Sequence, residues 1–128
     1  MTVTGSRITR CNEASERAGA DYVLYWMIGA RRTRYNPALE HAVALANRLA
    51  RPLLVVEPLR LDYPWASDRL HAFVLAGMAD NAAAFARHKV TYLPYVEPAR
   101  GAGKGLLREL ARRADWRPIP HMSEPWYC

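Results

Sequence analysis

Three near-continuous apolar runs divide the chain and predict three strands. They span residues 22–28, 53–56 and 90–96. None of them alternates cleanly between apolar and polar positions, which is typical of strands buried on both faces of a parallel sheet. The second run is predicted to end at Glu57-Pro58, and Pro94 within the third favours a place at the edge of the sheet.

A stretch with helical periodicity follows each run. The first begins at Asn36, a good N-cap residue before Pro37. The second begins at Ser67 or Asp68, and the third spans residues 104–114. We expect the buried faces to comprise Leu39, Ala42, Val43, Ala46 and Leu49 in the first helix, Leu70, Phe73, Val74, Met78 and Phe85 in the second, and Leu106, Leu107, Leu110 and Ala111 in the third.

The order of strand and helix, repeated three times, predicts an α/β fold. Crossovers between parallel strands are almost always right-handed, so the elements wind into an open, Rossmann-like parallel sheet. Residues 1–20 are polar and predict a flexible leader, whereas residues 115–128 are too rich in proline for a fourth buried strand. The sequence therefore predicts one α/β domain over residues 21–114, incomplete after its third β-α unit, and an irregular tail.

Composition narrows the class of protein. The chain is 51% hydrophobic and 23% charged, the balance of an ordinary globule. It has no apolar run near the roughly 20 residues that a membrane helix needs, and its first residues lack the apolar core of a secretory signal, so we expect a cytoplasmic location without membrane contact. Cys11 and Cys128 stand far apart, without a CxxC pair or histidines at metal-ligand spacing, so neither a metal site nor a disulfide framework is predicted.

Charge and glycine content suggest anion binding only weakly. The net charge of +6 suits an anionic partner such as nucleic acid, but solvated arginines explain it equally well. Gly101, Gly103, Lys104 and Gly105 open the third helix like a phosphate cradle, yet Leu106 stands where a P-loop requires Ser or Thr. A loop that lets the helix dock is the favoured interpretation. Histidine and aspartate residues are scattered, and no hydrolytic site is predicted.

One segment carries a resemblance to a known family. Trp26, Arg32 and the helix start at residues 36–39, Asn-Pro-Ala-Leu, have the spacing found in the N-terminal antenna domain of the DNA photolyase and cryptochrome family. The segment Tyr-Trp-Met at residues 25–27 is similar to the class II cyclobutane-dimer photolyases. Ser67, Arg69, Phe73 and Gly77-Met78 resemble the second helix of that domain. The family pattern differs at residues 28–30 and at Tyr35, where relatives carry charged residues.

The resemblance implies a chromophore site and a DNA contact. An antenna chromophore, a deazaflavin or a folate, would lie against Met27, Ile28, Gly29, Ala30, Arg31 and Glu57, with Arg31 facing an anionic group. An ordinary strand-to-helix loop is the simpler alternative. Arg31, Arg32 and Arg34 would contact DNA phosphates, although solvated loop charges are favoured because most duplex contact in relatives comes from their helical domain.

The implied function of the parent protein is light-dependent DNA repair. In relatives a large helical domain holds FAD, and this chain has no counterpart to it, so we expect the chain by itself to be non-catalytic and suspect a truncation or frameshift near Asp115. Two alternatives remain: a stand-alone nucleotide- or flavin-binding module, and an interaction domain that forms a homodimer through the bare edge of the first strand.

Overall fold

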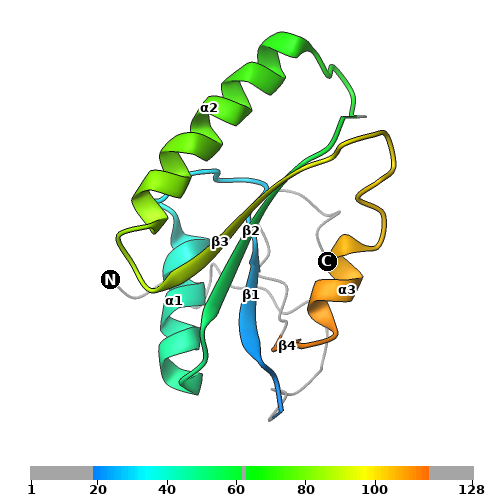
Figure 1. The fold of residues 1–128 in the computed structure, drawn as a ribbon. Coiled ribbons are helices and arrows are strands. Elements are labelled where there is room, and N and C mark those ends of the chain that lie inside the picture. Colours follow the sequence, from blue (N-terminus) through cyan, green and yellow to red (C-terminus); the bar gives the residue numbers. More distant parts are fainter. Residues whose placement is uncertain (1–18, 62, 116–128) are drawn as a thin grey trace.

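Parallel pairing of the predicted apolar runs builds a sheet of order β3-β2-β1-β4. The computed structural model describes residues 19–61 and 63–115 (Figure 1). The strands are β1 Tyr22–Trp26, β2 Leu53–Leu59, β3 Val90–Val96 and β4 Ala114–Asp115, and the helices are α1 Pro37–Leu49, α2 Asp68–Phe85 and α3 Leu106–Ala111. The α/β wound parallel sheet predicted from the sequence is confirmed. Most of the predicted leader, the tail beyond Asp115 and both cysteines lie outside the described residues.

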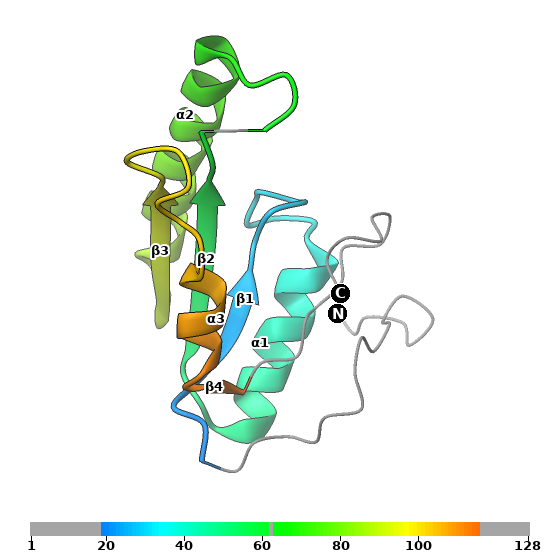
Figure 2. The same cartoon turned by 90° about the vertical axis from the view of Figure 1, so that its right-hand side faces the viewer.

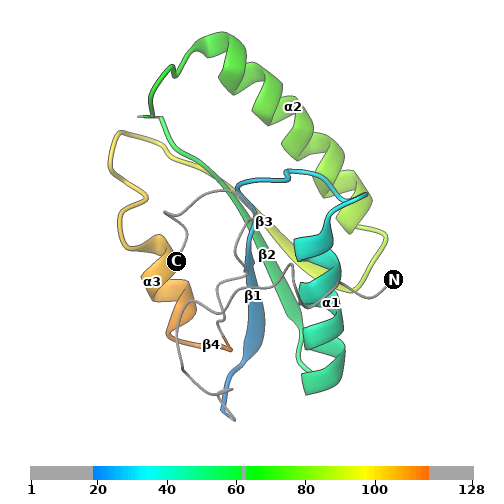
Figure 3. The same ribbon diagram turned by 180° about the vertical axis from the view of Figure 1, so that it is seen from behind.

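Helices cover both faces of the sheet. In Figure 1, α1 and α2 lie on one side of the strands and α3 on the other, and Figure 3 shows the same layers from behind. Successive side chains of a strand point to opposite faces, so two cores form. The first joins Val23, Tyr25, Met27, Leu53 and Val55 to α1 and to Phe85 of α2, and the second joins Leu24, Val56 and Ala114 to partly buried residues of α3.

The fourth strand begins where the predicted domain ends. Ala114 and Asp115 pair in parallel with Tyr22 and Val23 of β1. The sequence did not predict this two-residue strand. The edge of β1 that was expected to be bare is therefore covered over these two residues.

The strand β2 continues through Pro58, so the prediction that it ends at Glu57-Pro58 was wrong. Backbone groups of successive strand residues face alternate edges. The carbonyl of Val56 faces β1 and that of Leu59 faces β3, so the nitrogen of Pro58 faces the β1 side. Because β1 has already ended at Trp26, the missing N–H removes no bond from the ladder.

Pro94 lies in β3, which forms an edge of the sheet as predicted. The backbone N–H of Glu97 donates to the carbonyl of Leu59 at 2.9 Å, so odd-numbered residues of β3 face β2. Even-numbered residues, Pro94 among them, therefore face outward. An edge strand accommodates proline only in this orientation.

The cap predicted for α1 is confirmed and extends into the core. The Oδ1 atom of Asn36 accepts the backbone N–H of Leu39 at 3.1 Å. Its Nδ2 donates to the hydroxyl of Tyr25 at 3.1 Å and to the carbonyls of Ala30 and Arg32 at 3.0 Å each. One buried amide thus starts the helix and shapes the loop before it.

The buried face of α1 differs by one position from the prediction. Val43 is exposed, whereas Leu45 is buried with Leu39, Ala42 and Ala46. The face turned to the sheet is thus centred nearer to Leu45 than the periodicity alone indicates.

Only the second half of α2 packs on the sheet. Ser67 is the N-cap and accepts the backbone N–H of Leu70 at 3.2 Å. Met78 and Phe85 are buried as predicted, but Leu70 and Phe73 are exposed. Figure 2 shows the reason: the first half of the helix extends beyond the ends of the strands.

The third helix is shorter than the predicted span of 104–114. Gly101 and Gly105 have φ values of 79° and 83°, a left-handed conformation that no α-helix includes, so the helix starts only at Leu106. It ends at Ala111, because the chain must turn into β4 at Ala114.

The buried cap generates a stability prediction. We expect Asn36→Ala to lower the free energy of unfolding by about 3 kcal/mol, since it removes the cap and buried hydrogen bonds together. Urea denaturation measures this loss. Asn47→Ala, on the exposed face of the same helix, is the matched control and should change stability by less than about 0.5 kcal/mol. Equal effects of the two substitutions would contradict the role given to Asn36.

Candidate functional site

The carboxyl edge of the sheet is the candidate site. The chain winds from β1 out to β3 and then returns to the opposite side of β1 as β4, so the winding reverses beside β1. In open α/β sheets, ligands bind at the carboxyl ends of strands beside such a reversal. Three loops leave this edge: the β1–α1 loop (27–36), the β2–α2 loop (60–67) and the β3–α3 loop (97–105) (Figure 2).

A buried carboxylate organises this edge. Glu57 of β2 is 1% exposed. Its Oε1 atom accepts the hydroxyl of Tyr92 at 2.7 Å and Nδ2 of Asn81 at 2.8 Å, and its Oε2 atom accepts Nη1 of Arg31 at 3.2 Å. The cluster joins β2, β3, α2 and the β1–α1 loop. Because a buried charge without partners is strongly unfavourable, each of these bonds is needed to keep the carboxylate in place.

Arg31 is fixed in position by the backbone as well as by Glu57. Its Nη2 donates to the carbonyl of Pro58 at 2.8 Å, and its own carbonyl accepts Nδ2 of Asn81 at 3.3 Å. The side chain remains 27% exposed. The guanidinium is thus held at the rim of the sheet, with part of its surface open to a ligand.

The cluster raises the pKa of the Tyr92 hydroxyl. Burial is the largest cause, followed by the hydrogen bond to the Glu57 carboxylate and the negative charge of that group. An ionised phenol beside the carboxylate would place two negative charges together. The Tyr92 hydroxyl therefore stays protonated and donates a hydrogen bond to Glu57. The ring of Tyr92 also stacks on Phe85 at a centroid distance of 5.0 Å.

The residues predicted to line a chromophore site divide into buried and accessible groups. Met27 is fully buried in the core against α1, so its side chain does not face the rim. Ile28 and Ala30 are half-buried, and Gly29 is exposed. Arg31 and Glu57 are brought together as an ion pair. An accessible surface for a ligand is thus limited to residues 28–31 of this group.

The arginines predicted to contact DNA have different surroundings. Arg31 is paired with Glu57, as described. The Nε and Nη2 atoms of Arg32 donate to the carbonyl of Tyr35 at 3.2 and 3.0 Å, which fastens the turn before α1. Arg34 is exposed. Of the three, Arg34 and the outer part of Arg32 are placed to meet a phosphate.

A second buried carboxylate occupies the glycine-rich loop that resembles a phosphate cradle. The Glu97 carboxylate accepts the backbone N–H of Leu61 at 3.1 Å and that of Gly103 at 3.4 Å. The bond from Leu61, with further bonds from Gly103 and Gly101, holds the pKa of Glu97 below its ordinary value. The amides of this loop are thus already directed at an internal anion. Through its bonds to Leu61 and Gly103, the Glu97 carboxylate joins the β2–α2 and β3–α3 loops.

Three residues of these clusters were missed by sequence reasoning. Asn81, Tyr92 and Glu97 were not among the predicted site residues. Asn81 lies on the buried face of α2 between Met78 and Phe85, and a polar residue at such a position is a signal for a buried partner. Tyr92 and Glu97 had no such signal, because nothing local identifies the strand opposite them.

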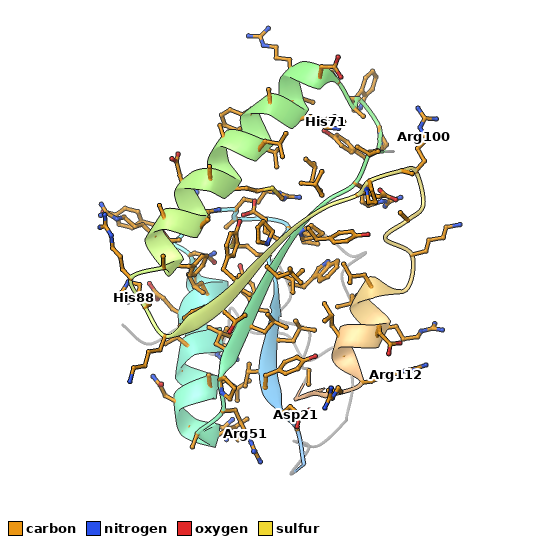
Figure 4. All side chains as sticks on the ribbon, in the orientation of Figure 1. Asp21, Arg51, His71, His88, Arg100 and Arg112 are labelled. Carbon is orange, nitrogen blue, oxygen red and sulfur yellow. The ribbon has the colours of Figure 1, made fainter. Side chains whose placement is uncertain are left out.

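The described part of the chain has neither a metal cluster nor a membrane-spanning helix. No group of three or more His, Cys, Asp or Glu side chains in residues 19–61 and 63–115 is arranged to hold a metal ion. Within the same residues, each helix is too short or too polar to cross a bilayer. Figure 4 shows that labelled charged residues lie at both ends of the sheet, with Arg100 at the carboxyl edge and Asp21 and Arg51 at the other.

The buried ion pair generates a prediction with a matched control. We expect Glu57→Gln to destabilise the protein by about 3 kcal/mol, because Arg31 loses its counter-charge in a site that is largely closed to water. Glu109→Gln disrupts a pair with Arg112 whose side chains are 71% and 67% exposed, and it should cost less than about 1 kcal/mol. Urea denaturation of both variants measures the difference. Similar small losses of stability in the two variants would show that the Arg31–Glu57 pair contributes no more than an exposed ion pair.

The raised pKa of Tyr92 generates a prediction about alkaline pH. Its pKa is higher in the folded than in the unfolded protein, so the stability linked to this group is present below about pH 10 and is lost as the pH rises further. We expect Tyr92→Phe to be less stable than the wild type at pH 8. The difference should shrink between about pH 10 and about pH 12, above the pKa of tyrosine in the unfolded chain. Tyr22 and Tyr25, whose pKa values are also raised, are common to both proteins and cancel. Urea denaturation of both proteins across this pH range measures the difference in stability. A difference that stays constant with pH would contradict the prediction.

Comparisons with known proteins identify one informative relative. No protein-family profile matches the chain. Over 78 residues, however, it is 37% identical to a deoxyribodipyrimidine photo-lyase from Methanothermobacter thermautotrophicus. The match covers 61% of this chain and 18% of the relative, so the chain spans less than a fifth of the length of that protein. The similarity supports the photolyase relationship that the segment from Trp26 to Leu39 predicted.

Proposed function

We propose that the chain forms the N-terminal α/β antenna domain of a photolyase-like protein. The observation that carries this proposal is the 37% identity to a photolyase in a chain that folds as a wound parallel sheet. The parent activity would be light-dependent reversal of pyrimidine dimers in DNA, and this chain would contribute no catalytic group to it. Tyr25-Trp26-Met27 supports a class II-like relative among the photolyases.

The proposed role of the domain is to hold an antenna chromophore, a deazaflavin or a folate, at its carboxyl edge. Gly29 is exposed and lets a flat ligand approach the backbone. Ile28 and Ala30 are half-buried and offer apolar contact beside it. Arg31 presents a guanidinium whose geometry is set by Glu57 and the carbonyl of Pro58, and such a group suits an anionic substituent of the ligand.

A stand-alone nucleotide- or flavin-binding module is the second candidate. The observation in its favour is the reversal of winding beside β1, the usual ligand position of open α/β sheets whatever their chemistry. DNA contact by Arg32 and Arg34 belongs to the first candidate, whereas a bound nucleotide would need only the edge of the sheet. The ligand released on denaturation of the purified protein separates the two.

Titration with chromophore tests the proposal. We expect a deazaflavin or a folate to shift its absorption band, or to lose fluorescence, when the protein is added. Gly29→Trp should weaken that binding at least about tenfold, a penalty of 1.4 kcal/mol or more for blocking the approach to the backbone. Gly19→Trp, at the opposite end of β1 in open surroundings, is the matched control and should bind as the wild type does. Unchanged spectra for both ligands would refute the antenna role.

A further inference from the structure

Two exposed aromatic residues have an unusual backbone conformation. Among the described residues, Tyr35, Ala50 and Trp65 are the non-glycine residues with positive φ, at 51°, 53° and 67°. The positive φ of Ala50 has a structural reason: Ala50 is the C-cap of α1, and its backbone N–H donates to carbonyls of the last turn. Tyr35 and Trp65 are instead loop residues whose side chains are 85% and 90% exposed.

Packing does not offset the unfavourable backbone conformation of either aromatic residue. The left-handed conformation is unfavourable for residues with a Cβ atom, and glycine or asparagine adopts it more readily. A large aromatic side chain in water gains nothing from the hydrophobic effect. An unfavourable conformation at an exposed residue is a reason to look for a function, because folding alone does not account for it.

Local contacts hold the backbone next to each of the two aromatic residues. The carbonyl of Tyr35 accepts two hydrogen bonds from Arg32, and the next residue is the buried cap Asn36. Near Trp65, the backbone N–H of Ala66 donates to the carbonyl of Tyr63 at 3.0 Å, and the ring of Tyr63 contacts His71 of α2 at a centroid distance of 5.5 Å. The backbone beside each ring is thus held by local contacts.

The two loops lie at the same edge of the sheet, and arginine residues are present in or next to both. The β1–α1 and β2–α2 loops both leave the carboxyl edge of the sheet (Figure 2). In the sequence, Arg32 and Arg34 come shortly before Tyr35, and Arg60 and Arg69 lie on either side of Trp65; all four are exposed. Arg100 lies at the same edge (Figure 4). The sequence of the β2–α2 connection also contains two acidic residues, Asp62 and Asp68. The five arginines outnumber them, so positive charge predominates.

We propose that these two loops bind a single strand of nucleic acid, with bases stacked on Tyr35 and Trp65 and with the flanking arginines on its phosphates. Exposed aromatic rings among arginines are the usual means of binding a strand whose bases are unpaired, since every base has a face that can stack. In a duplex these faces are covered by neighbouring bases. This binding goes beyond the antenna role, because it uses neither Gly29 nor a chromophore.

Fluorescence anisotropy with labelled oligonucleotides tests the proposal on the full 128-residue chain. The probes are oligothymidylate and oligouridylate strands of about fifteen nucleotides, roughly the upper length that a single-strand binding site contacts, and a duplex of the same length. We expect a single strand to bind more tightly than the duplex, with an affinity that falls as salt rises. The two single strands distinguish DNA from RNA as the preferred source.

Substitutions locate the binding. Tyr35→Ala and Trp65→Ala should each weaken it by between about 5-fold and about 150-fold, the range for the loss of one stacked base. Tyr35→Trp should restore it, because a ring is kept at that position. Phe73→Ala is the matched control: Phe73 is 78% exposed but belongs to α2 and to neither loop, and its loss should leave affinity unchanged.

Further variants separate stacking from charge and from folding. Arg34→Gln should flatten the salt dependence, whereas Arg87→Gln, near the far end of α2, should not. Tyr35→Gly should raise the melting temperature, since it relieves the backbone, while it lowers affinity. The proposal is overturned if the single strands do not bind, if Tyr35→Ala and Trp65→Ala bind as well as the wild type, or if Phe73→Ala is as damaging as they are. A chromophore that binds while the single strands do not would leave the antenna role standing and refute this inference alone.

Discussion

The arrangement of the carboxyl edge depends on one buried negative charge. Glu57 comes from the central strand β2, and its partners Arg31, Asn81 and Tyr92 come from a loop, a helix and the edge strand. A carboxylate in such surroundings is stable only when its partners are all in place, so it selects one arrangement of these elements. Apolar packing alone would tolerate small shifts of α2 against the sheet. The charge therefore contributes geometric specificity more than net stability.

Local signals in the sequence were sufficient for the existence of the first three strands, the start of α1 and the fold class. The apolar runs and the Asn36-Pro37 cap depend on neighbouring residues alone, and a parallel sheet follows from their order. The continuation of β2 through Pro58 was missed because it depends on where β1 stops. Likewise, the exposure of Phe73 depends on the length of the strands beneath α2, which the helix itself does not encode.

Two members of the Glu57 cluster were among the predicted site residues. Arg31 and Glu57 were both chosen, from segments 26 positions apart, and the structure joins them. Their purpose could not be predicted, because Asn81 and Tyr92 reach Glu57 only through the folding of α2 and β3 onto β2. Met27 was chosen with Arg31 and Glu57 because of its place in the sequence. It adjoins the loop in sequence, yet the alternation of the strand turns its side chain into the core.

The proline in β3 has a consequence for association between chains. An open edge strand offers its outward N–H groups as a template on which another chain can add a strand, and this is a route to aggregation. Along the outer edge of β3 the even-numbered positions provide these donors, and Pro94 has none to offer. An incoming strand would lose a bond midway along the edge, with Val90 and Tyr92 on one side of the gap and Val96 on the other. The same residue that fits the native sheet without loss thus discourages its growth into fibrils.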